Sequence, residues 1–128
     1  MDTIDDKNII PKNAKRMVLC SGKIYFELIE KRDKLKNTNV AIIRVEQLFP
    51  LNIDFIHKLY KKYNKSEIFW VQEEPENMGA WTFILSKLRK YDIKLISREE
   101  SAATASGSAK DSLQKQQLII DQVFDNIN

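Results

Sequence analysis

Two adjacent glutamates, Glu73 and Glu74, are the residues of this 128-residue chain best placed to do chemistry. They follow a short apolar run, residues 68–71, whose β-branched and aromatic residues predict a strand covered on both faces. Paired carboxylates at the end of such a strand could act as acid and base or bind a metal ion. However, successive side chains of an extended chain point apart, and two ligands are too few for a dedicated metal site. Interdomain salt bridges or helix capping are the simpler interpretation.

The residues after the two glutamates predict a tight loop that leads into a helix. Pro75 is expected to end the strand because it cannot donate to the ladder, and Asn77 and Gly79 supply turn residues. Gly79 should need either a positive φ or a close backbone approach, so Gly79→Val is expected to destabilise the domain. Trp81 then opens an apolar stripe at helical spacing. We interpret this segment as an interdomain or assembly loop, carried by Glu73, Glu74, Asn77, Gly79 and Trp81.

Three other positions could carry chemistry, but each has a simpler interpretation. Cys20 could be a nucleophile, yet it ends an apolar run, which is typical of a buried structural thiol. Ser21 and Gly22 follow that run as a phosphate-binding turn would, but without a glycine-rich fingerprint they indicate a tight turn and a helix cap. His57 lies beside Lys58 in a charged helical segment, which indicates a solvated surface residue.

The elements that must hold these residues alternate between strands and helices. Strands are predicted over residues 16–20, 40–45, 68–71 and 94–97, and helices from about residues 23, 53, 81 and 109, with Asn52 as an N-cap. This order indicates βαβ units, a mainly parallel sheet and right-handed crossovers. Residues 101–108 are small and polar and predict a loop. Residues 1–14 show no period and are expected to be a linker or N-terminal arm, which leaves one α/β domain over residues 15–128.

Composition excludes several classes of protein. The hydrophobic fraction of 43% and the charged fraction of 30% are ordinary for a soluble domain. The net charge of +3 comes from interspersed acids and bases, so no nucleic-acid partner is expected; the lysine clusters near residues 58–62 and 87–90 indicate solvated helix faces, or a surface for an acidic partner. One cysteine excludes an internal disulfide and suits a reducing compartment. No apolar run approaches the ~20 residues of a membrane span, and the acidic N-terminus is unlike a signal peptide.

Three ordered blocks of the chain resemble one protein family. They are Arg-Met-Val-Leu-Cys-Ser-Gly-Lys-Ile-Tyr at 16–25, Ala-Ile-Ile-Arg-Val-Glu-Gln-Leu-Phe-Pro at 41–50 and Trp-Val-Gln-Glu-Glu-Pro-Glu-Asn-Met-Gly-Ala-Trp at 70–81. Together they are similar to the extreme C-terminus of the first, decarboxylating component of the 2-oxoglutarate dehydrogenase complex. Ser97-Arg98 and the segment Ser106-Gly-Ser-Ala-Lys110, with Gln116-Gln117 beyond, also resemble the ending of that family. The similarity covers residues 15–128.

The resemblance implies the fold of the transketolase C-terminal domain, an α/β layer with a mostly parallel five-stranded sheet. It also implies the parent reaction of the citric acid cycle, in which thiamine diphosphate attacks 2-oxoglutarate, carbon dioxide leaves and a succinyl unit passes to a lipoyl group. Thiamine diphosphate and magnesium are bound in the family by upstream domains, so this chain alone is expected to be inactive. The implied partners are those upstream domains, the dimer mate and the dihydrolipoyl succinyltransferase component, in the bacterial cytoplasm or the mitochondrial matrix.

Some members of the family bind acetyl-CoA near the second block, and the resemblance extends to that region only in part. Gln47 matches the glutamine found there. The basic pair of those members falls on Asp54 and Phe55, which cannot replace the bidentate grip of arginine on phosphate. We therefore expect Gln47 to be a remnant of an effector site. Two milder departures are Ser112, where a histidine is frequent, and Met78, where glutamine is common.

A second hypothesis has the same fold but a different role. A stand-alone α/β binding or regulatory module could have kept the domain and lost the chemistry. An enzyme domain should expose apolar surface where its neighbours pack, particularly around Phe49, Trp70 and Trp81, whereas a free module should not.

Overall fold

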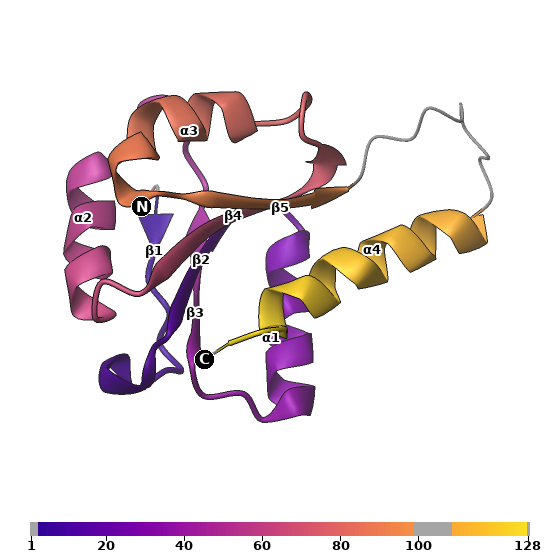
Figure 1. The fold of residues 1–128 in the computed structure, drawn as a ribbon, viewed down its shortest axis with the longest axis horizontal. Coiled ribbons are helices and arrows are strands. Elements are labelled where there is room, and N and C mark those ends of the chain that lie inside the picture. The colour runs from indigo at the N-terminus through magenta and orange to yellow at the C-terminus, as the bar shows by residue number, and fades with distance from the viewer. Residues whose placement is uncertain (1–2, 99–108, 128) are drawn as a thin grey trace.

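A five-stranded sheet organises the computed structural model, which describes residues 3–98 and 109–127 (Figure 1). Its strand order is β1 (Thr3–Ile4), β3 (Val40–Val45), β2 (Arg16–Cys20), β4 (Glu67–Pro75) and β5 (Lys94–Arg98). β1 pairs antiparallel with β3, and every other pairing is parallel. The central strand β2 is buried at all five positions, as expected for a parallel sheet covered on both sides. The mostly parallel five-stranded α/β fold predicted from the sequence is confirmed.

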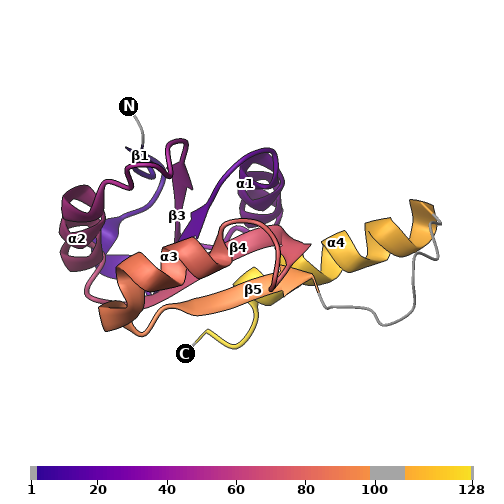
Figure 2. The ribbon, with the colours of Figure 1, turned by 90° about the horizontal axis from the view of Figure 1, so that it is seen from above.

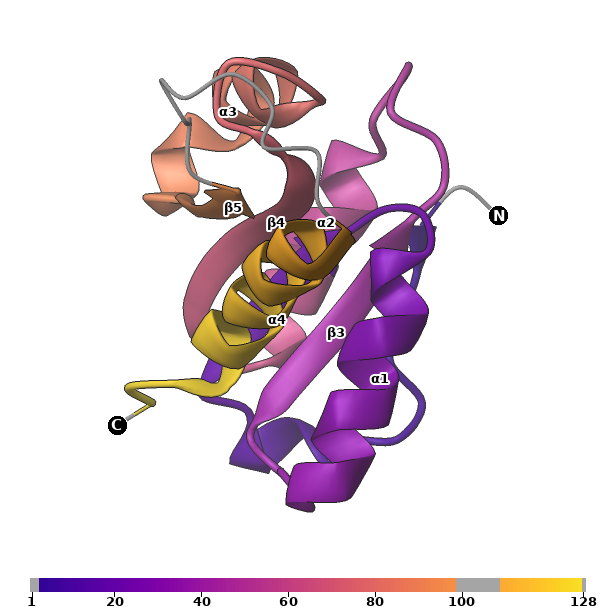
Figure 3. The same cartoon turned by 90° about the vertical axis from the view of Figure 1, so that its right-hand side faces the viewer.

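Helices cover both faces of the sheet. One face carries α1 (Ile24–Leu35) and α4 (Ala109–Phe124), which lie side by side in Figure 3. The other face carries α2 (Ile53–Lys62) and α3 (Trp81–Leu88), seen in Figures 1 and 2. Alternate residues of β2 divide between two apolar cores: Val18 and Cys20 pack with α1 and α4, while Met17 and Leu19 pack with α2 and α3. Short 3-10 helices over Pro11–Asn13 and Arg89–Tyr91 complete the described elements.

The N-terminal segment packs onto the sheet and does not form the linker or arm expected over residues 1–14. Thr3 and Ile4 pair with Val45 and Arg44, so the segment adds the edge strand β1. Beyond it, Asp6 is buried and forms an ion pair with Arg32 of α1, whose side chain is also buried. A two-residue strand and a single buried ion pair carry no periodic signal, which is why the sequence pattern did not predict them.

The C-terminal helix is fastened to the sheet by the first residue of β2. The side chain of Arg16 is 5% exposed, and its Nη1 donates to the carbonyl oxygens of Val123 at 2.8 Å, Asp125 at 3.0 Å and Gln122 at 3.3 Å. The guanidinium also lies over the ring of Phe69, 4.5 Å from its centroid. Because the last carbonyls of a helix lack intrahelical partners and carry its partial negative charge, a buried arginine here stabilises the end of α4.

Local signals placed most boundaries correctly, with two differences. Asn52 caps α2 as predicted, since its side chain accepts the N–H of Phe55 at 3.1 Å. β4 is longer than the predicted 68–71 and ends at Pro75, which pairs with Arg98 after a register shift; a proline is tolerated there because the ladder is already irregular. Leu35 continues the apolar stripe of Ile24 and Leu28 and was expected to face inward, but it is 50% exposed because it is the last residue of α1. The predicted loop over 101–108 lies outside the described residues.

Candidate functional site at the carboxyl edge of the sheet

A cleft opens where the carboxyl ends of β2 and β4 diverge. The chain leaves β2 for α1 on one face and leaves β4 for α3 on the other, so this edge is the switch point at which open α/β sheets bind ligands or partners. The cleft has a volume of about 480 Å³. Twelve residues line it: Ser21, Gly22, Leu48, Phe49, Trp70, Val71, Gln72, Glu73, Glu74, Gly79, Ala80 and Phe83. The two segments singled out in the sequence, 20–22 and 73–81, thus meet at one place.

Gln72 holds the loop at this edge with both ends of its side-chain amide. It is 4% exposed, and its Nε2 donates to the carbonyl oxygens of Pro75 at 2.8 Å, Met78 at 2.9 Å and Glu74 at 3.2 Å. Its Oε1 accepts the indole N–H of Trp70 at 2.9 Å and the backbone N–H of Trp81 at 3.1 Å. One amide therefore closes the turn and joins β4 to the start of α3. Sequence reasoning gave Gln72 no role, since a glutamine at a strand end has no distinctive signature.

Gly79 lies against this amide in a conformation that favours glycine. Its φ is +68°, and a Cβ at this position would lie 3.1 Å from Oε1 of Gln72 and 3.2 Å from the side chain of Glu74. Gly22, at the opposite side of the cleft, also has a positive φ of +80°, but no atom would lie within 4 Å of its Cβ. The expectation of a positive φ or a close approach at Gly79 is confirmed, and both conditions hold.

We expect Gly79→Val to reduce the free energy of unfolding by about 2–4 kcal/mol, because a β-branched residue would adopt a left-handed conformation and press on Gln72. Gly22→Val is the matched control, since it has the backbone cost without the collision. Urea unfolding followed by circular dichroism measures both variants. A loss at Gly79 no greater than the loss at Gly22 would show that the contact with Gln72 is unimportant.

The two glutamates do not form a carboxylate pair. Oε1 of Glu73 accepts a hydrogen bond from Nε2 of Gln116 on α4 at 2.8 Å, and the same nitrogen donates to Glu27 of α1 at 2.6 Å. Glu74 instead lies beside Gly79, on the side of the loop that Gln72 holds. The divergence expected for neighbouring residues of an extended chain is therefore present. Both glutamates line the cleft, but only Glu73 also joins β4 to α1 and α4 through Gln116.

The other predicted loop residues lie at different depths. Asn77 is exposed at the tip of the loop, beside Met78, which is 58% exposed. Trp81 is half-buried and packs against the core formed with α2 and α3. Gln47 is exposed outside this cleft, and its Nε2 donates to the carbonyl oxygen of Phe49 at 3.3 Å. The structure thus brings Glu73, Glu74 and Gly79 to the cleft and leaves Gln47 beside it.

The burial predicted for Cys20 agrees with the structure, whereas the exposure predicted for His57 does not. Cys20 is fully buried, and its Sγ donates to the carbonyl oxygen of Ile43 at 3.7 Å, which confirms the buried structural thiol. Burial raises the pKa of this thiol to about 12, with a smaller opposing effect from the Arg44 charge. The prediction of a solvated His57 is wrong. It is half-buried, and its Nδ1 lies 2.6 Å from the hydroxyl of Tyr91, because the 3-10 helix after α3 packs across α2.

We expect the buried thiol to make folding stability fall at alkaline pH. Between about pH 8.5 and pH 12 an unfolded chain releases the Cys20 proton while the folded chain keeps it, so stability falls by up to about 1.4 kcal/mol per pH unit. Cys20→Val should remove this component. The test is the free energy of unfolding of both proteins at pH 7, 9 and 10. Parallel curves over this range would contradict the expectation.

Within residues 3–98 and 109–127, no three or more His, Cys, Asp or Glu residues are grouped so that they could hold a metal ion. In the same part of the chain, no helix has the length and apolar character needed to cross a bilayer.

Comparison with known proteins identifies a family and a solved structure to which this chain is similar. Residues 1–124 match the family model described as 2-oxoglutarate dehydrogenase C-terminal. The chain is 41% identical over 132 aligned positions to the 2-oxoglutarate dehydrogenase E1 component of Rickettsia typhi, covering 95% of this chain and 14% of that protein. It is 36% identical to the mitochondrial 2-oxoglutarate dehydrogenase of Caenorhabditis briggsae, covering 89% of this chain and 12% of that protein. A solved structure described as a split gene transketolase, inactive beta4 tetramer, shares the fold with a TM-score of 0.63 and 12% identity, over 88% of this chain and 39% of that one.

Proposed function

This chain belongs to the family of 2-oxoglutarate dehydrogenase C-terminal domains, and we propose that it is the structural and assembly domain of such an enzyme, without a catalytic site of its own. The observation that carries the proposal is the match over nearly the whole chain to one terminal segment of much longer relatives. The chain spans 14% of the first of them. The chemistry of the whole enzyme would then reside in the remaining length.

The geometry of the carboxyl edge supports an assembly role. Glu73 is hydrogen-bonded to Gln116, and the Cys20 thiol is buried with a raised pKa, so neither is poised to react. The loop at the edge is rigid, because Gln72 ties it down, yet Asn77 and Met78 at its tip are exposed. A rigid, exposed loop loses little conformational entropy on docking. We propose that the loop carrying Glu73, Glu74, Asn77, Gly79 and Trp81 packs against the preceding domains of the enzyme.

The cofactors and partners of the parent reaction are part of this proposal. Thiamine diphosphate and magnesium would bind to the preceding domains, as the resemblance to the family implies. Thiamine diphosphate supplies the ylid and electron sink for loss of carbon dioxide. The other proposed partners are the dimer mate and the dihydrolipoyl succinyltransferase component, in the bacterial cytoplasm or the mitochondrial matrix. We further propose that Gln47 is an effector-site remnant, because exposed Asp54 lies in the first turn of the neighbouring helix, where a phosphate would need a cation.

The decisive experiment measures 2-oxoglutarate decarboxylation with thiamine diphosphate and magnesium. This chain would be assayed alone and mixed with the Rickettsia typhi E1 component from which the matching C-terminal segment had been removed. Activity only in the mixture is the expected result. Activity of this chain alone would overturn the assignment of chemistry to the preceding domains. If both folded pieces stay inactive together, a stand-alone α/β binding or regulatory module becomes the better interpretation.

We expect Glu73→Gln to weaken this assembly and leave the chemistry unchanged. Glutamine can still accept from Gln116 but lacks the charge that Glu73 presents at the edge. The concentration of variant needed for half-maximal activity in the mixture should rise about 3–10-fold, the size of a surface-charge contribution near 1 kcal/mol, at unchanged maximal rate. Glu76→Gln, an exposed charge of the same loop, is the control. Normal assembly combined with a lost maximal rate would instead assign Glu73 to the chemistry.

A further inference from the structure

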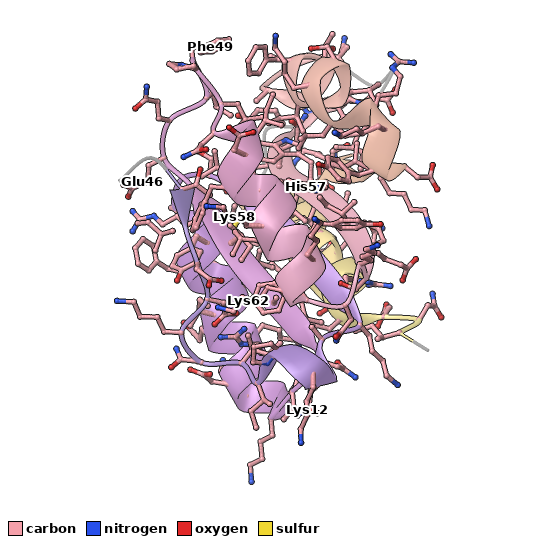
Figure 4. All side chains as sticks on the ribbon, turned by 90° about the vertical axis from the view of Figure 1, so that its left-hand side faces the viewer. Lys12, Glu46, Phe49, His57, Lys58 and Lys62 are labelled. Carbon is pink, nitrogen blue, oxygen red and sulfur yellow. The ribbon has the colours of Figure 1, made fainter. Side chains whose placement is uncertain are left out.

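A basic surface lies where the C-terminal half of α2 meets the N-terminal segment. Its charge comes from the exposed lysines Lys12, Lys58, Lys61, Lys62 and Lys65. In Figure 4, Lys58 and Lys62 lie along α2 and Lys12 lies beyond the end of that helix. The two stretches of sequence are held together by Asn64, whose Nδ2 donates to the carbonyl oxygens of Pro11 at 2.9 Å and Ala14 at 3.2 Å. Lys12 therefore belongs to the same surface as the lysines of α2.

Most of the positive charge on this surface is unpaired. Within residues 3–98 and 109–127, Lys62 forms an ion pair with Asp5, whereas the other lysines of the surface form none. Asp54 lies four positions before Lys58, but no ion pair joins the two. The negative end of the α2 dipole favours cations in the last turn of the helix, yet it falls off within that turn and has little effect on Lys58 or Lys12. Positive charge therefore remains for a partner to neutralise.

An exposed isoleucine adjoins the lysines. Ile10 is 57% exposed and directly precedes the 3-10 helix that carries Lys12. Its backbone is held in place, because its carbonyl oxygen accepts the N–H of Asn13 at 2.9 Å and Asn64 binds the next carbonyl, that of Pro11. A fixed apolar side chain beside a charged rim is the usual anatomy of a protein–protein contact.

We propose that this basic surface binds an acidic segment of a partner protein, with Ile10 in contact with an apolar residue of that segment. The carboxylates of the partner meet lysines that have no acidic neighbour of their own, so the charges are complementary. Lysine suits this partner, because its ammonium group is a point charge on a flexible stem and can bond carboxylates that approach from different directions. The inference rests on this surface alone and does not depend on a role within a dehydrogenase.

Two other polyanions fit the surface less well. Proteins that bind single-stranded nucleic acids stack the bases on aromatic rings, but Tyr63 is buried and Tyr60 packs against Tyr91, with 4.9 Å between ring centroids. A helix that binds an anionic bilayer directs an apolar face outward, whereas Ile56 and Leu59 of α2 are buried in the core. An acidic protein segment needs neither feature, and it is the partner that the surface favours.

Fluorescence anisotropy of a labelled, glutamate-rich peptide with a single leucine tests the proposal on the whole chain. We expect a dissociation constant of about 10–100 µM at low salt that rises steeply with added salt, because exposed charge pairs are individually weak and screened. Lys58→Glu combined with Lys61→Glu should raise this constant about tenfold or more. Lys23→Glu combined with Lys36→Glu, at the two exposed ends of α1, changes the net charge equally and should raise it less than about threefold.

The control variants decide whether the place of the charge matters. An equal loss in the two double variants would overturn the proposal, because binding would then follow net charge alone. Absence of binding would overturn it too, as would tighter binding to a single-stranded oligonucleotide or to vesicles of phosphatidylserine and phosphatidylcholine. All four substituted lysines are exposed, so circular dichroism should show unchanged folding.

A second pair of variants tests the apolar contact. Ile10→Ser should raise the dissociation constant of the peptide about threefold, because the leucine of the peptide loses its apolar neighbour. Leu35→Ser is the matched control, since Leu35 is also an exposed aliphatic residue and lies at the end of α1. Equal effects of the two substitutions would contradict the contact assigned to Ile10.

Discussion

Replacing Asp6 by alanine is expected to remove about 3–5 kcal/mol from the free energy of unfolding, a large part of the stability of a domain this size. Asp6 and Arg32 form an ion pair whose side chains are 1% and 4% exposed. The carboxylate also accepts the backbone N–H of Ile42 at 2.8 Å and that of Asn8 at 2.9 Å. Its loss would leave the Arg32 guanidinium buried with the carbonyl of Val40, 3.0 Å away, as its remaining acceptor among the described contacts.

A control ion pair lies on α1, the helix that carries Arg32. Glu30→Ala breaks an exposed pair with Lys34, whose side chains are 69% and 71% exposed, and should change stability by less than about 0.5 kcal/mol. The double variant Asp6→Leu with Arg32→Met should recover much of the loss, because it removes both charges and keeps apolar volume. Chemical unfolding of the unchanged protein, the two alanine variants and the double variant compares their free energies of unfolding. A loss below about 1 kcal/mol for Asp6→Ala would mean that water or another group replaces the carboxylate.

The second large effect is expected at Gln72. In Gln72→Glu, the group that donates to three carbonyl oxygens becomes an acceptor and faces them with negative charge. We expect a loss of about 3 kcal/mol at neutral pH, from unsatisfied carbonyls and a buried charge. The loss should shrink as the pH falls from neutral toward the ordinary pKa of glutamate, about 4.3, because a protonated glutamate can again donate one hydrogen bond.

The same variant should loosen the loop as well as the domain. Hydrogen exchange of the Trp81 amide, which donates to Oε1 of Gln72, reports the loop directly. Gln114→Glu, on an exposed part of α4, is the matched control and should change stability by less than about 0.5 kcal/mol. If Gln72→Glu and Gln114→Glu unfold at the same denaturant concentration, the amide is not what holds the loop.

Local patterns in the sequence predicted the strands and helices because each of these patterns has a direct physical cause. The buried strand at 16–20 is recognisable from an unbroken apolar run, and the start of α2 from the capping geometry of Asn52. The three family blocks then predicted the fold and the family, and they include the segments that form the cleft. Gly79 was recognised for the same reason, since few residues adopt its backbone conformation.

The contacts that fasten the site were not predictable in this way. Asp6 and Ile42 are 36 positions apart, and Gln116 and Glu73 are 43 apart, so neither contact leaves a local pattern. The partner of Gln72 depends on how α3 packs beside β4, and the partner of His57 depends on how the 3-10 helix Arg89–Tyr91 packs on α2. Polar residues of this kind appear, in a sequence, no different from residues that face water.

The hydrogen bonds between Arg16 and the end of α4 affect when the domain can fold during its synthesis. The bond from Arg16 to the carbonyl of Val123 spans 107 positions, almost the entire chain. β2 is the central strand, and α1 covers only part of one of its faces before Ile119, Ile120 and Val123 of α4 complete that core. During synthesis the sheet would emerge with a partly open apolar face, so the domain should finish folding only after residue 124 has left the ribosome. Chaperone contact during that interval, and sensitivity to removal of α4, follow from the same late closure.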